Sequence, residues 1–237
     1  MAKQLMAGVS EGGLRNYPLV SIIIPTFNSG AMIGACLKSI GGQTYPNIEV
    51  IIVDRYSKDG TREIAKKFNA KTLLMNAERS AARNRGVAAS KGSFVFFLDS
   101  DMELTPKVVE ECVTTGLKGG ADAVIIPEVP VAQGFLGECR KIEKELFIGD
   151  RFTEIPRFFR KEIFLKVGGF NERLIYGEDA DLYARLDGAG YKTRRIEAEV
   201  RHYEGALSLR QIVFKAHDYG KTLPLFVRKN PSLAVKR

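Results

Sequence analysis

The sequence predicts an α/β fold, a doubly wound and mainly parallel sheet with helices on both faces. The first indication is a set of short apolar runs that do not alternate with polar residues, as is typical of strands covered on both faces. These runs occupy residues 20–24, 48–53, 93–98 and 121–126. The second indication is that helical patterns separate the runs, because alternating strands and helices favour a parallel sheet. A chain of 237 residues, 45% of them apolar and 27% charged, is long enough to bury a sizeable core.

Three helices are expected between these strands. Ser57 or Asp59 can cap a helix that runs to about residue 68, and residues 78–89 form a second one. Thr105 followed by Pro106 is typical of a helix start, and this third helix is expected to run to about residue 117.

The second half of the chain is less regular. Its expected elements are a strand end with a short helix over residues 158–167, a helix over residues 179–189 and an edge strand over residues 192–200. Leu182, Leu186 and Ala189 recur at helical spacing, so they are predicted to share the inner face of that helix.

The basic charge of the chain is concentrated at one end. The net charge is +8, from 36 basic and 28 acidic residues. Residues 201–237 hold eight basic and two acidic side chains, a net +6, which leaves +2 for the first 200 residues. A nearly neutral body without a basic and aromatic recognition face argues against a nucleic-acid-binding protein.

Other features indicate where the chain works. Residues 1–16 lack a secretory apolar region and are predicted to be a flexible tail, and no apolar run is long enough to span a bilayer. The cysteines Cys36, Cys112 and Cys139 are widely spaced, which excludes a disulfide framework and a cysteine zinc site. This use of cysteine is typical of a reducing, cytoplasmic compartment.

Carboxylates follow two of the predicted strands. Asp54 ends the second strand, and Asp99 and Asp101 follow the third. In open α/β sheets, ligands bind at the carboxyl ends of the strands. Two carboxylates so close together repel each other unless a cation lies between them, and Mg²⁺ or Mn²⁺ with a phosphate-bearing substrate is the natural partner. The alternative is that one of the two caps the helix that begins near Thr105.

The first strand leads into a loop that excludes two common nucleotide-binding motifs. The sequence PTFNSG at residues 25–30 is not Gly-x-Gly-x-x-Gly, so a dinucleotide-binding fold loses its main support. The chain also lacks the Gly-x-x-x-x-Gly-Lys-Ser/Thr motif of P-loop phosphoryl transfer.

Asp179 and His202 are further candidates. Asp179 lies three residues before Leu182, so its side chain is expected to face inward, where a carboxylate can accept a proton from an attacking hydroxyl. The alternative is that it only complements the helix dipole. His202 follows the last strand and could supply a metal ligand, or it could be structural. Asp181 and Arg185 are expected to form an exposed ion pair.

The set of motifs resembles the inverting nucleotide-sugar glycosyltransferases of family 2, which have the GT-A fold. The matching segments are VSIIIPTFN at residues 20–28, VD at 53–54 with SKDGT at 57–61, ARNRG at 82–86, FLDSD at 97–101, GGFNE at 168–172, and GEDADL at 177–182 with RL at 185–186. Each segment alone is weakly specific, but they occur in the family's order. The resemblance covers residues 17–205, which are predicted to form the GT-A catalytic domain.

The resemblance implies how the donor is bound. Pro25, Thr26 and Asp54 would line the pocket for the base and ribose of a nucleotide-diphosphate sugar. Arg83 would approach the donor diphosphate. The sequence departs from the family at Arg55, where a second aspartate is common, so the resemblance leaves the nucleotide unassigned.

The resemblance also implies metal and catalytic roles. Asp99 and Asp101 would form the Asp-x-Asp motif that binds Mn²⁺ or Mg²⁺, with Asp101 the more direct ligand. His202 matches a histidine that completes the metal site in some members. Asp179 would be the catalytic base, and Glu178 beside it joins the predicted substrate-binding residues. Met102 stands where a third acidic residue often follows, which leaves the main ligands in place.

The acceptor is the least determined part of the prediction. Residues 206–237 form a basic, amphipathic segment, with Leu209, Ile212, Val213 and Ala216 at helical spacing. Such a segment can lie on an anionic membrane surface, so we expect a protein at the inner face of the cell membrane, spans beyond residue 237 and a saccharide or lipid-linked acceptor. The alternative for this segment is a helix packed on its own domain. The alternatives for the reaction are transfer to a polyprenyl phosphate and a sugar nucleotidyltransferase.

Overall fold

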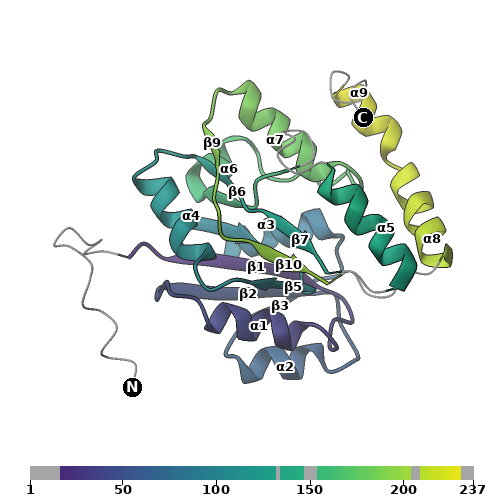
Figure 1. Ribbon diagram of the computed structural model, residues 1–237, viewed down its shortest axis with the longest axis horizontal. Helices are drawn as coiled ribbons and strands as arrows, with labels where there is room; N and C mark the ends of the chain where they lie inside the picture. Colours follow the sequence, from purple (N-terminus) through teal and green to yellow (C-terminus); the bar gives the residue numbers. More distant parts are fainter. Residues whose placement is uncertain (1–16, 132–133, 147–153, 204–208, 231–237) are drawn as a thin grey trace.

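The computed structural model describes residues 17–131, 134–146, 154–203 and 209–230 (Figure 1). Its larger sheet has seven strands in the order β3-β2-β1-β4-β8-β6-β9. In that order the strands are Lys71–Leu74, Ile48–Asp54, Val20–Thr26, Phe94–Phe97, Phe158–Arg160, Ala123–Ile125 and Thr193–Arg195. Strands β3, β2, β1 and β4 are parallel, β8 is antiparallel to both of its neighbours, and β6 and β9 are parallel. The predicted mixed, mainly parallel sheet is confirmed.

A smaller sheet of three strands lies beside the first. Its order is β5-β10-β7, with bounds Met102–Leu104, Val200–His202 and Glu128–Pro130. Strand β10 is antiparallel to β5 and pairs His202 with Met102. Strand β10 is thereby folded back against the segment that follows β4.

Helices cover both faces of the larger sheet, as predicted. The helices are α1 Ile33–Gly41, α2 Thr61–Lys67, α3 Arg79–Ala89, α4 Val108–Leu117, α5 Gly134–Glu145, α6 Lys161–Lys166, α7 Glu178–Gly188, α8 Leu209–Gly220 and α9 Leu223–Lys229. Ile22 and Ile24 of β1 pack in the cluster that includes α1, α2 and α4, whereas Ile23 packs with α3, α6 and α7. Successive strand residues point to opposite faces, so a strand buried on both faces must be apolar throughout.

The predicted elements are present with shifted bounds. Helix α4 begins at Val108 because Pro106 lies in a preceding turn, and residues 192–200 divide into β9 and β10. Of these two strands, β9 is at the edge of its sheet and β10 is central, and Ala189 is exposed rather than on the inner face of α7. Helices α1 and α5 were not predicted. Strands β3, β5 and β7 were not predicted either, because strands of three or four residues carry too little periodicity to identify.

The carboxyl-terminal segment contains two helices with different surroundings. In α9, Phe226 is buried with Leu174 and Ala180, so this helix packs on its own domain. In α8, Val213 and Phe214 are 67% and 58% exposed. Within the described residues, no helix has the length and apolar character needed to cross a membrane.

One close contact joins α3 to the sheet. A Cβ atom added at Gly86 would lie 2.3 Å from Cγ2 of Ile23 in β1. Side chains do not approach so closely, and Ile23 is fully buried, so it has little room to move. The close approach of α3 to β1 therefore depends on the missing side chain at Gly86.

We predict that Gly86→Ala lowers the free energy of unfolding by about 1–3 kcal/mol, because overpacking outweighs the better helix propensity of alanine. Urea unfolding of the purified chain measures this change. Gly34→Ala in α1 is the matched control, since its added methyl group meets only Cγ2 of Ile64, at 3.8 Å. Unchanged stability of Gly86→Ala would contradict the close packing.

Candidate active site

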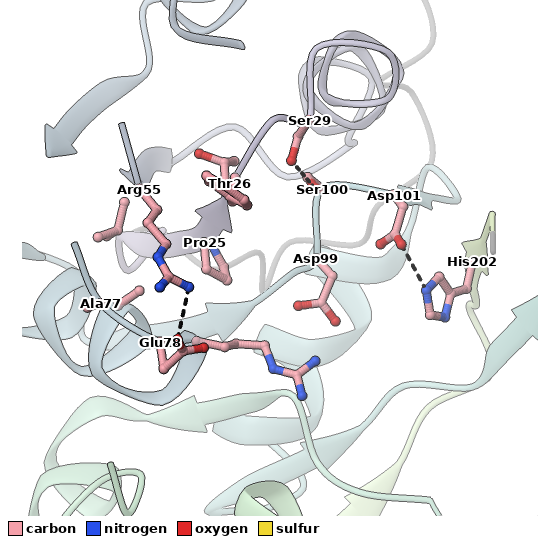
Figure 2. Close-up of a pocket in the computed structure, with 14 residues that line it drawn as sticks. Pro25, Thr26, Ser29, Arg55, Ala77, Glu78, Asp99, Ser100, Asp101 and His202 are labelled. Atoms are coloured by element: carbon pink, nitrogen blue, oxygen red, sulfur yellow. Dashed lines mark hydrogen bonds and ion pairs between the residues drawn. The ribbon is translucent and has the colours of Figure 1, made fainter. Parts of the chain in front are cut away.

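A cavity of about 350 Å³ lies at the carboxyl ends of β1, β2 and β4 (Figure 2). It is lined by Pro25, Thr26, Phe27, Ser29, Val53, Arg55, Ala77, Glu78, Arg79, Ala82, Asp99, Ser100, Asp101 and His202. Figure 2 shows Arg55 and Glu78 at one end, Asp101 and His202 at the other, and Asp99 between them. The carboxylates that follow β4 therefore reach the expected ligand-binding edge of the sheet.

Asp99 is held by two arginines. Its Oδ1 lies 2.8 Å from Nη2 of Arg83, and its Oδ2 lies 3.2 Å from Nη1 of Arg157. Burial alone would raise the pKa of Asp99, but Arg83, Arg157 and Arg79 together hold it well below its usual range. Helix α4 has no side-chain cap, so the alternative role of Asp99 or Asp101 as its cap is wrong.

A second group of charges surrounds His202. Its Nε2 lies 3.3 Å from Oδ2 of Asp101, and its Nδ1 lies 2.6 Å from Oε1 of Glu128. The other oxygen of Glu128 lies 2.9 Å from Arg157. Burial lowers the pKa of His202, but the hydrogen bonds to Asp101 and Glu128 outweigh it and raise that pKa to about 9. The antiparallel pairing of β10 with β5 places His202 beside Asp101.

Asp179 is joined to this group through Arg83. Its Oδ1 lies 3.0 Å from Nη1 of Arg83, and its side chain is 35% exposed. The two carboxylates, Asp99 and Asp179, therefore share one guanidinium, which also lies 5.2 Å from the ring of Phe170. Neither Asp179 nor Arg83 lines the cavity, so Asp179 is linked to it through Arg83 and the cavity-lining Asp99. Its position in the first turn of α7 is also compatible with the helix-dipole alternative.

Glu178 is buried next to Asp179. Its Oε1 lies 2.7 Å from Nη2 of Arg79, and its side chain is 4% exposed. Burial and the neighbouring Asp179 raise the pKa of Glu178, against the opposing effect of Arg79. Glu178 is not among the cavity-lining residues, so its contact with the site is through Arg79.

Pro25 and Thr26 line the cavity, but Asp54 does not. Asp54 is fully buried and accepts hydrogen bonds from the Thr26 hydroxyl at 2.8 Å and the Ser57 hydroxyl at 2.5 Å. It also accepts one from the Ser57 amide at 2.8 Å. Asp54 therefore ties the end of β1 to the loop after β2, instead of facing a ligand.

Arg83 does not line the cavity, although the resemblance implies that it approaches the donor diphosphate. It is 1% exposed and engaged by Asp99 and Asp179, so in this structure it does not face the cavity. Arg79, one helical turn earlier in α3, lines the cavity with a side chain that is 42% exposed. The spacing of four residues could have suggested Arg79, because both residues share one face of the helix.

Arg157 and Glu128 were missed for a different reason. Neither lies in a recognisable motif, and each is distant in sequence from its partners: 58 residues separate Arg157 from Asp99, and 74 separate Glu128 from His202. The ion pair of Asp181 and Arg185 is present, at 2.9 Å. Asp181 is only 4% exposed, so the prediction of an exposed pair is wrong.

The side chains present allow a limited test of metal binding. Within the described residues, no group of three or more His, Cys, Asp or Glu side chains is arranged to hold a metal ion. Asp99 directs both oxygens at arginines, whereas Asp101 and His202 converge and line the cavity. Asp101 and His202 therefore fit a divalent cation as two protein ligands, provided that substrate or water oxygens supply the others and that His202 loses its proton.

Comparison with known proteins identifies the chain's relatives. Residues 21–171 match the model for glycosyl transferase family 2, and residues 157–206 match that for the N-terminal domain of galactosyltransferase. Glycosyltransferase AglE of Haloferax volcanii is 32% identical over 191 residues, which are 73% of this chain and 63% of AglE. The poly(ribitol-phosphate) β-N-acetylglucosaminyltransferase TarP of Staphylococcus aureus is 34% identical over 54% of this chain and 40% of TarP. The chain thus spans less than two thirds of the length of these relatives.

Solved structures share the fold. S. aureus TarS (residues 1–349) in complex with UDP-GlcNAc superposes with a TM-score of 0.65 at 20% identity, over 80% of this chain and 60% of that one. The mannosyltransferase PcManGT of Pyrobaculum calidifontis, in complex with GDP-Man and Mn²⁺, has the same TM-score at 20% identity, over 84% and 60% of the two chains.

We predict that Arg83→Met destabilises the protein by about 3–5 kcal/mol, because Asp99 then keeps only one of its two contacting arginines, Arg157. Adding Asp99→Asn should restore about 1–3 kcal/mol of the loss, since the uncompensated charge is removed. The measurement is urea unfolding of four proteins: the unaltered chain, Arg83→Met, Asp99→Asn and the double variant, which form a double-mutant cycle.

The same cycle has a pH dependence. A carboxyl whose pKa is lowered on folding contributes stability above its unfolded pKa, and that contribution is lost as the pH falls through its folded pKa. The loss of folding stability caused by Asp99→Asn should thus be largest at neutral pH and shrink only in strong acid. Additive single changes, or a deficit independent of pH, would contradict the coupling.

Proposed function

Because the chain belongs to glycosyltransferase family 2, whose members are inverting nucleotide-sugar-dependent enzymes, we propose that its cavity binds a nucleotide-diphosphate sugar and transfers the sugar to an acceptor hydroxyl. The observation that carries this proposal is the convergence of Asp101 and His202 at one end of the cavity, with Asp179 linked to the cavity through Arg83 and Asp99. An earlier alternative, a sugar nucleotidyltransferase, is wrong because the family is one of glycosyltransferases.

The donor diphosphate belongs at the charged end of the cavity. Asp101 and His202 would hold Mn²⁺ or Mg²⁺, which when bound supplies positive charge to the leaving diphosphate. Arg79 is the cavity-lining arginine at the amino end of α3, and we assign it the diphosphate contact expected of Arg83. Asp99 then has a positioning role, because its oxygens fix Arg83 and Arg157.

The reaction is a single displacement at the anomeric carbon. The acceptor oxygen forms a bond to that carbon as the bond to the diphosphate oxygen breaks, and the nucleoside diphosphate leaves with the electron pair. Asp179 accepts the proton of the acceptor hydroxyl. Arg83, 3.0 Å from Oδ1 of Asp179, orients the carboxylate, whose side chain is 35% exposed and therefore accessible to an acceptor. An anionic polyprenyl phosphate would have little need of such a base, so a hydroxyl acceptor is favoured.

Two helices outside the cavity carry exposed apolar side chains suited to a membrane. Helix α5 exposes Phe135 and Ile142, at 81% and 58%, on one face, and Leu146, just past the end of the helix, is 78% exposed. Helix α8 adds the exposed Val213 and Phe214. With the basic residues of the carboxyl-terminal segment, these side chains favour adsorption to an anionic bilayer and a lipid-linked acceptor at the cytoplasmic face of the membrane.

We predict that Asp179→Asn lowers kcat by about 10²–10⁴-fold and leaves donor affinity nearly unchanged, because only proton transfer is lost. Asp187→Asn, at the exposed end of the same helix, is the matched control and should keep full activity. The measurement combines transfer assays on a panel of sugar nucleotides with calorimetric titration of the donor, each with Mn²⁺ and with chelator. Full activity of Asp179→Asn would overturn the assignment of the base.

We predict that the chain binds vesicles of phosphatidylglycerol at low salt and that the double change Phe135→Glu and Ile142→Glu abolishes most of this binding, because it places charge on the apolar face. Co-sedimentation measures the bound fraction, and neutral phosphatidylcholine vesicles should retain less protein. Leu165→Glu, at an exposed leucine of α6, is the control. Absence of binding by the unaltered chain at low salt would remove the membrane from the proposal.

A further inference from the structure

The end of the cavity away from Asp101 and His202 holds an ion pair whose role is not explained by stability. Nη1 of Arg55 lies 2.9 Å from Oε1 of Glu78, and both residues line the cavity (Figure 2). We propose that this pair reads the base of the nucleotide donor and that the base is guanine. The inference rests on the proposed function, since it takes the diphosphate to lie at the Asp101 end.

The apolar side chains that line the cavity suit a flat base. If the diphosphate is bound beside Asp101, the nucleoside must extend toward Arg55 and Glu78, because Figure 2 shows these residues at opposite ends with Asp99 between. Pro25, Val53, Ala77 and Ala82 line the cavity with short apolar side chains. Such side chains can contact the two faces of a planar ring, which leaves its polar edge to be matched by charged groups.

Arg55 is held in place by three contacts. Besides Glu78, its Nε donates to Oδ1 of Asn76 at 3.1 Å, and its guanidinium lies 5.6 Å from the ring centre of Phe27. The side chains of Arg55 and Glu78 are 40% and 55% exposed, and ion pairs this exposed add little to stability. The arrangement therefore orients a guanidinium and a carboxylate side by side while both retain hydrogen-bonding capacity for a ligand.

Guanine presents the edge that complements this pair. Its O6 and N7 are adjacent acceptors that an arginine can bind with two hydrogen bonds. Its N1–H and 2-amino group are adjacent donors, and the two oxygens of a carboxylate can accept both. O6 stands next to N1, so the arginine and the carboxylate must be neighbours, as Arg55 and Glu78 are.

Other bases match less well. Uracil offers Arg55 a single acceptor, O4, and offers Glu78 a single donor, N3–H, with the O2 acceptor beside it facing the carboxylate. Adenine places an amino group where guanine has O6, so it would direct a donor at the arginine. Guanine thus makes two hydrogen bonds with each member of the pair, where uracil makes one.

The test is calorimetric titration of the full chain with GDP, UDP, ADP and IDP in the presence of Mn²⁺. We expect GDP to bind about tenfold or more tightly than UDP or ADP. IDP lacks only the 2-amino group, so its affinity should fall between those of GDP and UDP. Glu78→Gln and Arg55→Met should each abolish most of the preference for GDP, because guanine loses two hydrogen bonds where uracil loses one, and Glu63→Gln, on the exposed side of α2, should retain the preference.

The outcomes separate the two proposals. If no nucleoside diphosphate binds with or without Mn²⁺, the proposed function fails and the base assignment fails with it. If UDP or ADP binds as tightly as GDP, or if IDP equals GDP, the guanine assignment is wrong while the proposed function stands. Equal weakening of all four nucleotides by Glu78→Gln would show that the pair only shapes the loop, which also overturns the assignment.

Discussion

The organisation of the site depends on a single partly buried carboxylate, Asp99, held between two guanidiniums. Arg83 is 1% exposed and Arg157 is 19% exposed, so neither charge has the solvation that it would have in water. Each arginine also binds a second carboxylate, Asp179 for Arg83 and Glu128 for Arg157. Alternating charges of this kind are stable only as a complete set, because removal of one member leaves its neighbours buried without compensation.

The set of charges extends from one side of the site to the other. From Asp179 it passes through Arg83, Asp99, Arg157 and Glu128, and then to His202 and Asp101. The residue proposed to accept a proton and the residues proposed to hold the cation are thus parts of one electrostatic network. Their relative positions follow from side-chain contacts inside the protein, which preorganises the charges before a substrate binds.

The charged side chains of the site differ in how exposed they are. Around Asp99 the arginine side chains are largely buried, with Arg83 1% and Arg157 19% exposed. At the far end Arg55 and Glu78 are about half exposed and contact mainly each other, Asn76 and Phe27. A buried network constrains chemistry common to many substrates, whereas an exposed pair can be exchanged at small cost in stability, which suits a determinant of donor identity.

The sequence by itself determined the class of fold, most of the strands and helices of the larger sheet, the family and the location of the carboxylates after β4. These features are encoded locally: burial on both faces makes a strand apolar throughout, and the ligand edge of such a sheet follows from strand direction. The tertiary structure alone decided which charges meet. Arg157 and Glu128 come from segments distant in sequence, Arg83 is withdrawn into the interior where Arg79 faces the cavity, and Asp54 is buried beneath Thr26. A motif specifies residue types and spacing, but the partner of a charged side chain depends on which distant segments the fold packs against it.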